Sequence, residues 1–100
     1  MVYRVAVSQK AHRDLRCIQR YISVDSPQVA ARLGQLFFSK EIMLGTHPEI
    51  ERVVPEISNF VIREIVVKRY RIIYKVDHLK KEIRILRYWH ADRATPDIRD

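Results

Sequence analysis

The sequence is poor in the residues that mark unusual classes of protein. It has one cysteine, Cys17, so no internal disulfide can form and nothing indicates an oxidising compartment. Two glycines and four prolines in 100 residues are too few for a fibrous or low-complexity chain. No stretch approaches the roughly 18 apolar residues of a membrane helix, and the first residues lack the apolar segment of a signal peptide. We therefore expect one cytoplasmic domain over residues 1–100 that makes no membrane contact.

Several kinds of catalytic and cofactor site are missing as well. Gly34 and Gly45 are the only glycines, so the sequence has no glycine-rich loop that could bind phosphates. The four histidines fall in separate predicted elements, and with a single cysteine they make no pair at metal-ligand spacing. The sequence therefore predicts neither a metal nor a cofactor.

The sequence does contain an excess of positive charge. Lysine and arginine total 19 against 12 acidic residues, a formal net charge of +7. Residues 60–100 hold 11 basic and 6 acidic side chains, so +5 of that charge lies in this part of the chain. A basic half on a small domain favours a polyanionic partner, either nucleic acid or an acidic protein segment. The simpler alternative is a charged surface that only keeps the protein soluble.

Two helices are predicted in the first half of the chain. Ser8 is expected to cap the first, because apolar residues then recur at helical spacing over residues 8–24. Proline fits the first position of a helix, so Ser26 is expected to cap the second helix and Pro27 to begin it, with residues 27–44 helical. The short joint predicts an antiparallel helical hairpin.

Strands are predicted on either side of that hairpin. Residues 45–60, opened by Gly45, are expected to form a loop, and the polar tail from Ala91 is expected to fray. The segments that alternate, or are rich in β-branched and aromatic residues, are 2–7, 61–67, 71–76 and 83–89. Short turns join the last three, which must therefore be antiparallel. The expected fold class is α+β: an N-terminal strand, a helical hairpin, then three strands, with the helices covering one face of a four-stranded antiparallel sheet.

Strand alternation indicates where the basic residues lie. Arg63 shares a face with Ile65, whereas Arg71 is predicted on the opposite side of the next strand from Ile72. In the last segment neither face is cleanly apolar, which indicates a bulge near residues 86–88 or a sheet face open to a ligand. Some or all of four arginines, together with a histidine at the strand end, could hold phosphates. These residues are Arg63, Arg71, Arg84, Arg87 and His90. Alternatively, these arginines only keep one face of the sheet solvated.

Four segments of the sequence resemble a known family. They are YRVAVSQKAHRDLRCIQRYI, DSPQVAARL, IREIVVKRYRIIYKV and IRILRYWHADR, and the most specific pieces run from Arg63 to Tyr74 and from Leu86 to His90. Together they resemble the RelE/ParE superfamily of bacterial toxins from type II toxin–antitoxin pairs, also called plasmid stabilisation proteins. The resemblance implies an antiparallel sheet packed against a helical hairpin, and it covers nearly the whole chain.

The superfamily uses two mechanisms. RelE-like members cut messenger RNA on the ribosome, and this resemblance would make Arg71 the phosphate-holding residue and His90 the general acid, supported by Arg63, Arg87 and Tyr88. ParE-like members inhibit DNA gyrase and block replication without cutting anything themselves. No convincing general base accompanies the first set, and the long hairpin and Trp-His ending resemble the ParE branch, which we favour. The RelE-like nuclease is the alternative.

Either branch implies a cognate antitoxin in a hetero-oligomeric complex. Its flexible, acidic C-terminal segment would fold onto this chain and neutralise the basic sheet. The residues expected to bind a partner are Arg63, Arg69, Arg71, Arg84, Arg87 and Trp89. A third hypothesis is a non-toxic binding module of the same fold, for which growth would stay normal when the chain is expressed without an antitoxin.

Overall fold

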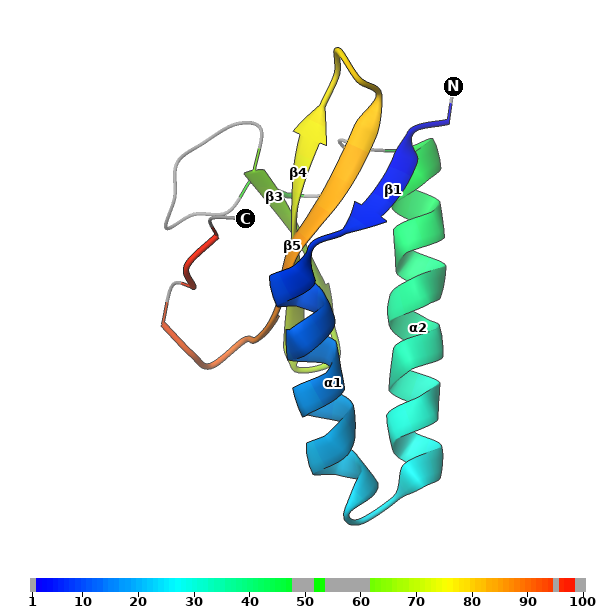
Figure 1. Cartoon of the computed structure of the whole chain (residues 1–100), viewed down its shortest axis with the longest axis vertical. Coiled ribbons are helices and arrows are strands. Elements are labelled where there is room, and N and C mark those ends of the chain that lie inside the picture. Colours follow the sequence, from blue (N-terminus) through cyan, green and yellow to red (C-terminus); the bar gives the residue numbers. More distant parts are fainter. Residues whose placement is uncertain (1, 48–51, 54–61, 95, 99–100) are drawn as a thin grey trace.

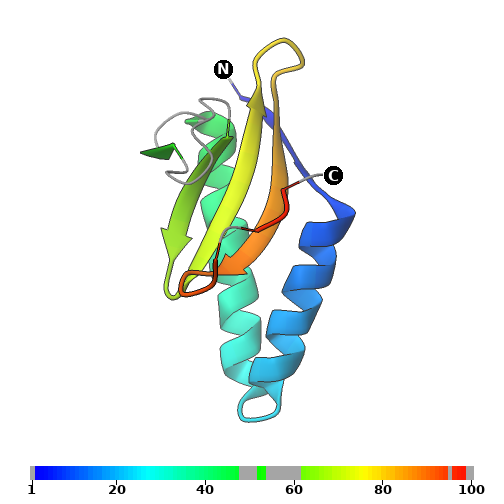
Figure 2. The same cartoon turned by 90° about the vertical axis from the view of Figure 1, so that its left-hand side faces the viewer.

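Two helices lie side by side along a twisted sheet in the computed structural model, which describes residues 2–47, 52–53, 62–94 and 96–98 (Figure 1). The elements follow in the order β1 (Arg4–Val7), α1 (Gln9–Ser23), α2 (Pro27–Thr46), β2 (Arg52–Val53), β3 (Ile62–Val67), β4 (Tyr70–Asp77) and β5 (Glu82–His90). Figure 2 looks onto the sheet, with α2 passing behind it. The predicted α+β fold with a helical hairpin and three antiparallel strands is confirmed.

The helices begin where the sequence predicts. The hydroxyl of Ser8 accepts a hydrogen bond from the Ala11 amide at 3.1 Å, and that of Ser26 accepts one from the Val29 amide at 3.2 Å. Each cap satisfies one of the amide groups that the first helical turn leaves without a partner. Pro27 occupies the first turn of α2, as expected.

Helix α2 extends past the predicted exit at Gly45. The Gly45 carbonyl accepts a hydrogen bond from the Tyr3 amide at 2.7 Å, and a Cβ at Gly45 would lie 2.9 Å from the Tyr3 carbonyl oxygen. The glycine is therefore needed for the close approach of the N-terminal segment to α2, and it does not end the helix. Most of the predicted loop over residues 45–60 lies outside the described residues; within it, β2 pairs with β3.

The strand order is β1-β5-β4-β3-β2. Strands β3, β4 and β5 are antiparallel as predicted, but β1 pairs with β5 in parallel, so the expected wholly antiparallel sheet is wrong at this edge. A short turn fixes strand direction only between consecutive strands. Between β1 and β5 lies most of the chain, including the hairpin, and the direction of β1 follows from the tertiary path.

The predicted bulge in the last strand is present. Tyr74 lies opposite Ile85 but its neighbour Ile73 lies opposite Arg87, so Leu86 is the extra residue on β5. Because of it, Ile85 and Tyr88 both enter the core between sheet and helices, whereas Leu86 turns to the other face.

The residues after β5 fold back over the face of the sheet turned away from the helices (Figure 2). The Trp89 indole donates to the Ala94 carbonyl at 2.7 Å, and Ile98 packs against the cluster formed by Ile62, Ile73 and Leu86. The predicted fraying from Ala91 is therefore wrong for residues 91–94 and 96–98. The strands leave apolar side chains on this second face, and covering them removes apolar surface from water.

The two glycines of α2 give matched tests of this packing. We expect Gly45→Ala to lower the free energy of unfolding by about 1–3 kcal/mol, because the new methyl group meets rigid backbone. Gly34→Ala places its methyl group against the flexible end of the Gln19 side chain and gains helix propensity, so its unfolding free energy should stay within about 1 kcal/mol of the parent. Urea unfolding of the two variants measures the difference, and equal stability would contradict this account of Gly45.

Candidate functional site

The residues expected to bind or cleave a partner lie on both faces of the sheet. The register places Arg71 opposite Trp89, Arg84 opposite Lys75 and Arg87 opposite Ile73, all on the face turned away from the helices. Three further residues of the predicted set face the helices. Arg63 lies opposite the core residue Tyr74 and His90 lies opposite Tyr70. Tyr88 is in the core itself. The structure therefore does not bring the full predicted set together.

Arg71 is buried and already paired. Its residue is 4% exposed, and its Nε donates to the carboxylate of Glu64, which is 1% exposed. Removing one partner of such a pair leaves an uncompensated charge in a site of low dielectric constant, which is strongly unfavourable. The pair therefore links β3 to β4, and a phosphate at the Arg71 Nε would compete with Glu64.

Arg87 fastens α1 to β5. Its Nε and Nη2 donate to the two carboxylate oxygens of Asp14 at 2.7 and 2.8 Å, while Asp14 also accepts from the Tyr88 amide at 3.1 Å. Strand β1 ends at Val7, so the edge of β5 beyond it needs another acceptor, which Asp14 supplies. These hydrogen bonds to Asp14 raise the pKa of Arg87, whose guanidinium also lies 4.6 Å from the Trp89 ring centre.

Tyr88 and His90 have different surroundings. The Tyr88 hydroxyl donates to Glu41 on α2 at 2.6 Å, and its ring stacks on Phe37 with 5.1 Å between centroids. Burial, followed by this hydrogen bond, raises the pKa of Tyr88. His90 is partly exposed at the end of β5, with its ring edge-on to Tyr70 at 5.3 Å and its Nδ1 accepting from the Asp92 amide at 3.2 Å.

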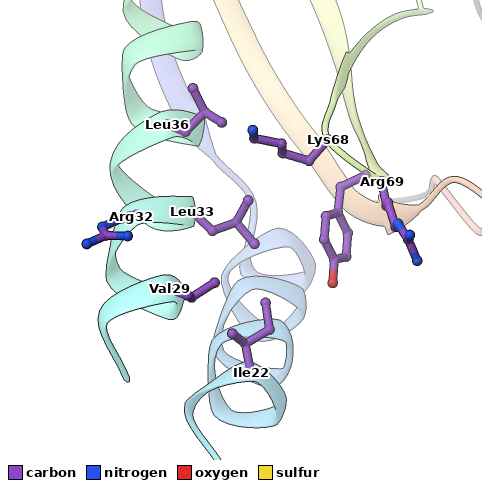
Figure 3. A pocket seen from close by; sticks show the side chains of 8 residues that line it. Ile22, Val29, Arg32, Leu33, Leu36, Lys68 and Arg69 are labelled. Carbon is purple, nitrogen blue, oxygen red and sulfur yellow. The ribbon is translucent and has the colours of Figure 1, made fainter. Parts of the chain in front are cut away.

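The surface best suited to a partner is an apolar cleft of about 520 Å³ between the helices and the β3–β4 turn (Figure 3). Its apolar lining comes from both helices and β4, and its rim is basic. The lining residues are Ile22, Val29, Arg32, Leu33, Leu36, Lys68, Arg69 and Tyr70. Three of the eight are cationic and none is acidic, so the cleft suits an apolar segment that carries acidic residues.

The cleft exists because the closed end of the hairpin extends past the β3–β4 turn in both views (Figures 1 and 2). The hairpin is offset along the sheet and is not longer than it, because α2 with 20 residues and β5 with 9 residues are both about 30 Å long. Apolar residues on that end lack a sheet to cover them, and Val29 is 48% exposed.

Of the predicted partner-binding residues, only Arg69 lines this cleft; the sequence analysis missed Arg32, Lys68 and the apolar lining. The apolar stripe of the second helix could have indicated the cleft, because it is wider than one sheet face can cover. The tight turn also contributes: Lys68 has φ of 57°, a left-handed conformation uncommon for residues other than glycine. It lets two residues reverse the chain and places both of their basic side chains at the cleft.

Within the described residues, no group of three or more histidine, cysteine, aspartate or glutamate side chains could hold a metal ion. In the same part of the chain, no helix combines the length and apolar character needed to cross a bilayer.

Comparisons with known proteins agree with the fold. The family model of the ParE toxin of the type II toxin–antitoxin system parDE matches residues 5–95. Among solved structures, a chain of the chromosomal ParDE system from P. aeruginosa is 20% identical with a TM-score of 0.73, covering 91% of this chain and 98% of that one.

Two further structures are similar. The RelBE2 toxin–antitoxin complex from Mycobacterium tuberculosis contains a chain 21% identical, with a TM-score of 0.60 and coverage of 90% of this chain and 99% of that one. A mutant of the E. coli toxin RelE in the free state is 18% identical, with a TM-score of 0.61, and the match covers 92% of this chain and 86% of that one. Among curated proteins, none is significantly similar in sequence.

The buried carboxylate of Glu41 predicts an unusual pH dependence. Burial raises the pKa of Glu41 in the folded state above its ordinary value of 4.5, against the opposing effect of the Tyr88 hydrogen bond. A raised carboxyl pKa means that the folded state binds the proton more tightly, so this residue's contribution to stability falls as pH rises from about 4.5 through the folded pKa. We expect Glu41→Gln to be more stable than the parent near neutral pH, with a smaller difference at pH 4, measured by urea unfolding. A difference that grows on acidification would contradict this.

Proposed function

This chain belongs to the ParE family of toxins from type II toxin–antitoxin systems, and we propose that it binds DNA gyrase, blocks replication and is neutralised by a cognate antitoxin. The match to the family model spans most of the chain. The similar ParDE structure supports an antitoxin as one partner. The positions of Arg71 and His90 help to distinguish gyrase from messenger RNA as the target.

The observation that carries the proposal is the separation of Arg71 from His90. Cleavage of RNA through its own 2′-hydroxyl needs a cation on the phosphate and an acid on the leaving oxygen, both at one phosphodiester. Here Arg71 faces away from the helices and is paired with Glu64, whereas His90 lies on the other face of the sheet against Tyr70. This arrangement supports action by binding over action as a RelE-like nuclease.

The antitoxin would occupy the apolar cleft. A flexible segment that folds on binding must bury enough apolar surface to offset the entropy of ordering. The cleft offers Val29, Leu33 and Leu36 for this purpose, and Lys68 and Arg69 at the rim would pair with acidic residues of the segment. The partner would therefore present apolar side chains inward and carboxylates toward the β3–β4 turn.

Parallel assays of supercoiling and RNA cleavage test the target. We expect the purified chain to inhibit supercoiling by gyrase at micromolar concentration, and His90→Ala to inhibit equally, because inhibition by binding needs no general acid. In a translating extract we expect no codon-linked cuts in messenger RNA.

Cuts that disappear in His90→Ala, with gyrase unaffected, would establish the RelE-like alternative instead. If neither activity appears and growth stays normal without the antitoxin, the chain is a non-toxic binding module.

A carboxylate introduced in the cleft tests the antitoxin site. Val29→Glu places a carboxylate on the half-exposed apolar floor, and we expect it to weaken binding of the antitoxin segment at least tenfold, a loss of about 1.4 kcal/mol or more. Ala31→Glu is the matched control, because residue 31 is exposed on the same helix and does not line the cleft.

Isothermal titration with the C-terminal segment of the cognate antitoxin measures both variants. Equal affinities for the two would place the antitoxin elsewhere.

A further inference from the structure

A second cavity, of about 360 Å³, lies between α1 and α2 and shares no lining residue with the apolar cleft. Val7 of β1 and Tyr88 of β5 contribute to it from the sheet, and Phe37, Phe38 and Glu41 contribute from α2. At Gly34 the Gln19 side chain of α1 lies directly over the backbone of α2. The cavity is therefore built into the hairpin and is independent of the surface assigned to the antitoxin.

Glu41 is the unusual residue in this cavity. It is 7% exposed, and its one hydrogen-bond partner is the Tyr88 hydroxyl, at 2.6 Å. In the described part of the chain no lysine, arginine or histidine forms an ion pair with it, although the protein carries a net charge of +7. Burying a carboxylate without a counter-charge is costly, and such groups mark functional sites when they line a cavity.

A purely structural role does not account for the charge. A hydrogen bond from Tyr88 to α2 needs only an acceptor, which the neutral side chain of glutamine would supply with a smaller desolvation cost. Burial raises the pKa of Glu41, against the opposing effect of the Tyr88 hydrogen bond, and among the described residues no cation forms an ion pair with the carboxylate. A ligand that brings a positive charge would stabilise the Glu41 carboxylate.

The remaining walls specify what else the ligand needs. Leu15, Phe37 and the Tyr88 ring make most of the lining apolar, and Phe38 at the rim is 64% exposed. His12 and Gln19 of α1 are the other polar side chains of the lining, and among the described residues His12 forms no ion pair with Glu41. A volume near 360 Å³ is at the small end of the range for ligand pockets, which run from about 300 to 1,000 Å³. Mostly apolar and aromatic walls with one carboxylate suit a cation on a hydrocarbon stem better than a metal ion or a sugar.

We propose that this cavity binds an organic ammonium ion, a protonated amine on an apolar stem whose charge pairs with Glu41 and whose stem packs against Leu15 and Phe38. Inorganic cations are poorer candidates because the described residues supply one carboxylate here and no cluster of ligands. The chemistry is shared by free amines and by the side chain of a lysine presented by a partner protein.

Titration of the full-length chain with matched probes tests the site. Phenethylammonium and phenethyl alcohol have the same shape and differ in charge, so we expect the ammonium ion to bind at least tenfold more tightly near neutral pH, with amide shifts centred on residues 34–41 and 88. In Glu41→Gln that preference should disappear. Glu82→Gln is the control, since it removes a carboxylate that pairs with Arg4 outside the cavity and should leave the preference intact.

A second variant tests the packing of the apolar stem independently of Glu41. Phe38→Ala alters an exposed side chain and should weaken both probes severalfold while leaving the preference for the ammonium ion. A parallel titration with Nα-acetyl-lysine methylamide separates the two sources: tighter binding of the capped lysine assigns a partner's side chain, and tighter binding of phenethylammonium assigns a free amine. Equal affinity of the ammonium ion and the alcohol, or a preference that survives in Glu41→Gln, would overturn the proposal.

Discussion

The offset of the helical hairpin along the sheet is the constraint on which the proposed binding surface depends. The closed end of the hairpin extends past the β3–β4 turn (Figures 1 and 2), although α2 with 20 residues and β5 with 9 residues are both about 30 Å long. The overhanging end carries apolar residues such as Val29 that the sheet cannot cover. An uncovered apolar surface with a basic rim is what a neutralising partner needs.

The bulge at Leu86 divides the functional candidates between the faces of the sheet. Without the extra residue, alternation would place Arg87 with Ile85 and His90 with Arg84. With it, Arg87 turns away from the helices and reaches Asp14, while His90 turns toward Tyr70. The inserted residue thereby moves His90 off the face that carries Arg84 and Arg71, and Arg71 is the arginine with which nuclease chemistry would pair it.

Sequence reasoning succeeded where short-range rules apply. The caps at Ser8 and Ser26, the three antiparallel strands and the bulge near Leu86 all follow from hydrogen bonding or alternation over a few residues. It failed for the parallel direction of β1 and for the folded segment after Ala91, because each depends on contacts between distant parts of the chain. The two residues of β2 are too few for any periodic signal.

The sequence by itself determined the elements, the family and the excess of basic residues, since each is a property of local pattern or composition. Only the tertiary structure decided which of those charges are available. Arg71 and Arg87 are held by Glu64 and Asp14, whereas Arg69 remains at the cleft. Asp14, the partner of Arg87, lies 73 positions away in the chain, and the tertiary fold, which no local pattern encodes, brings the two together.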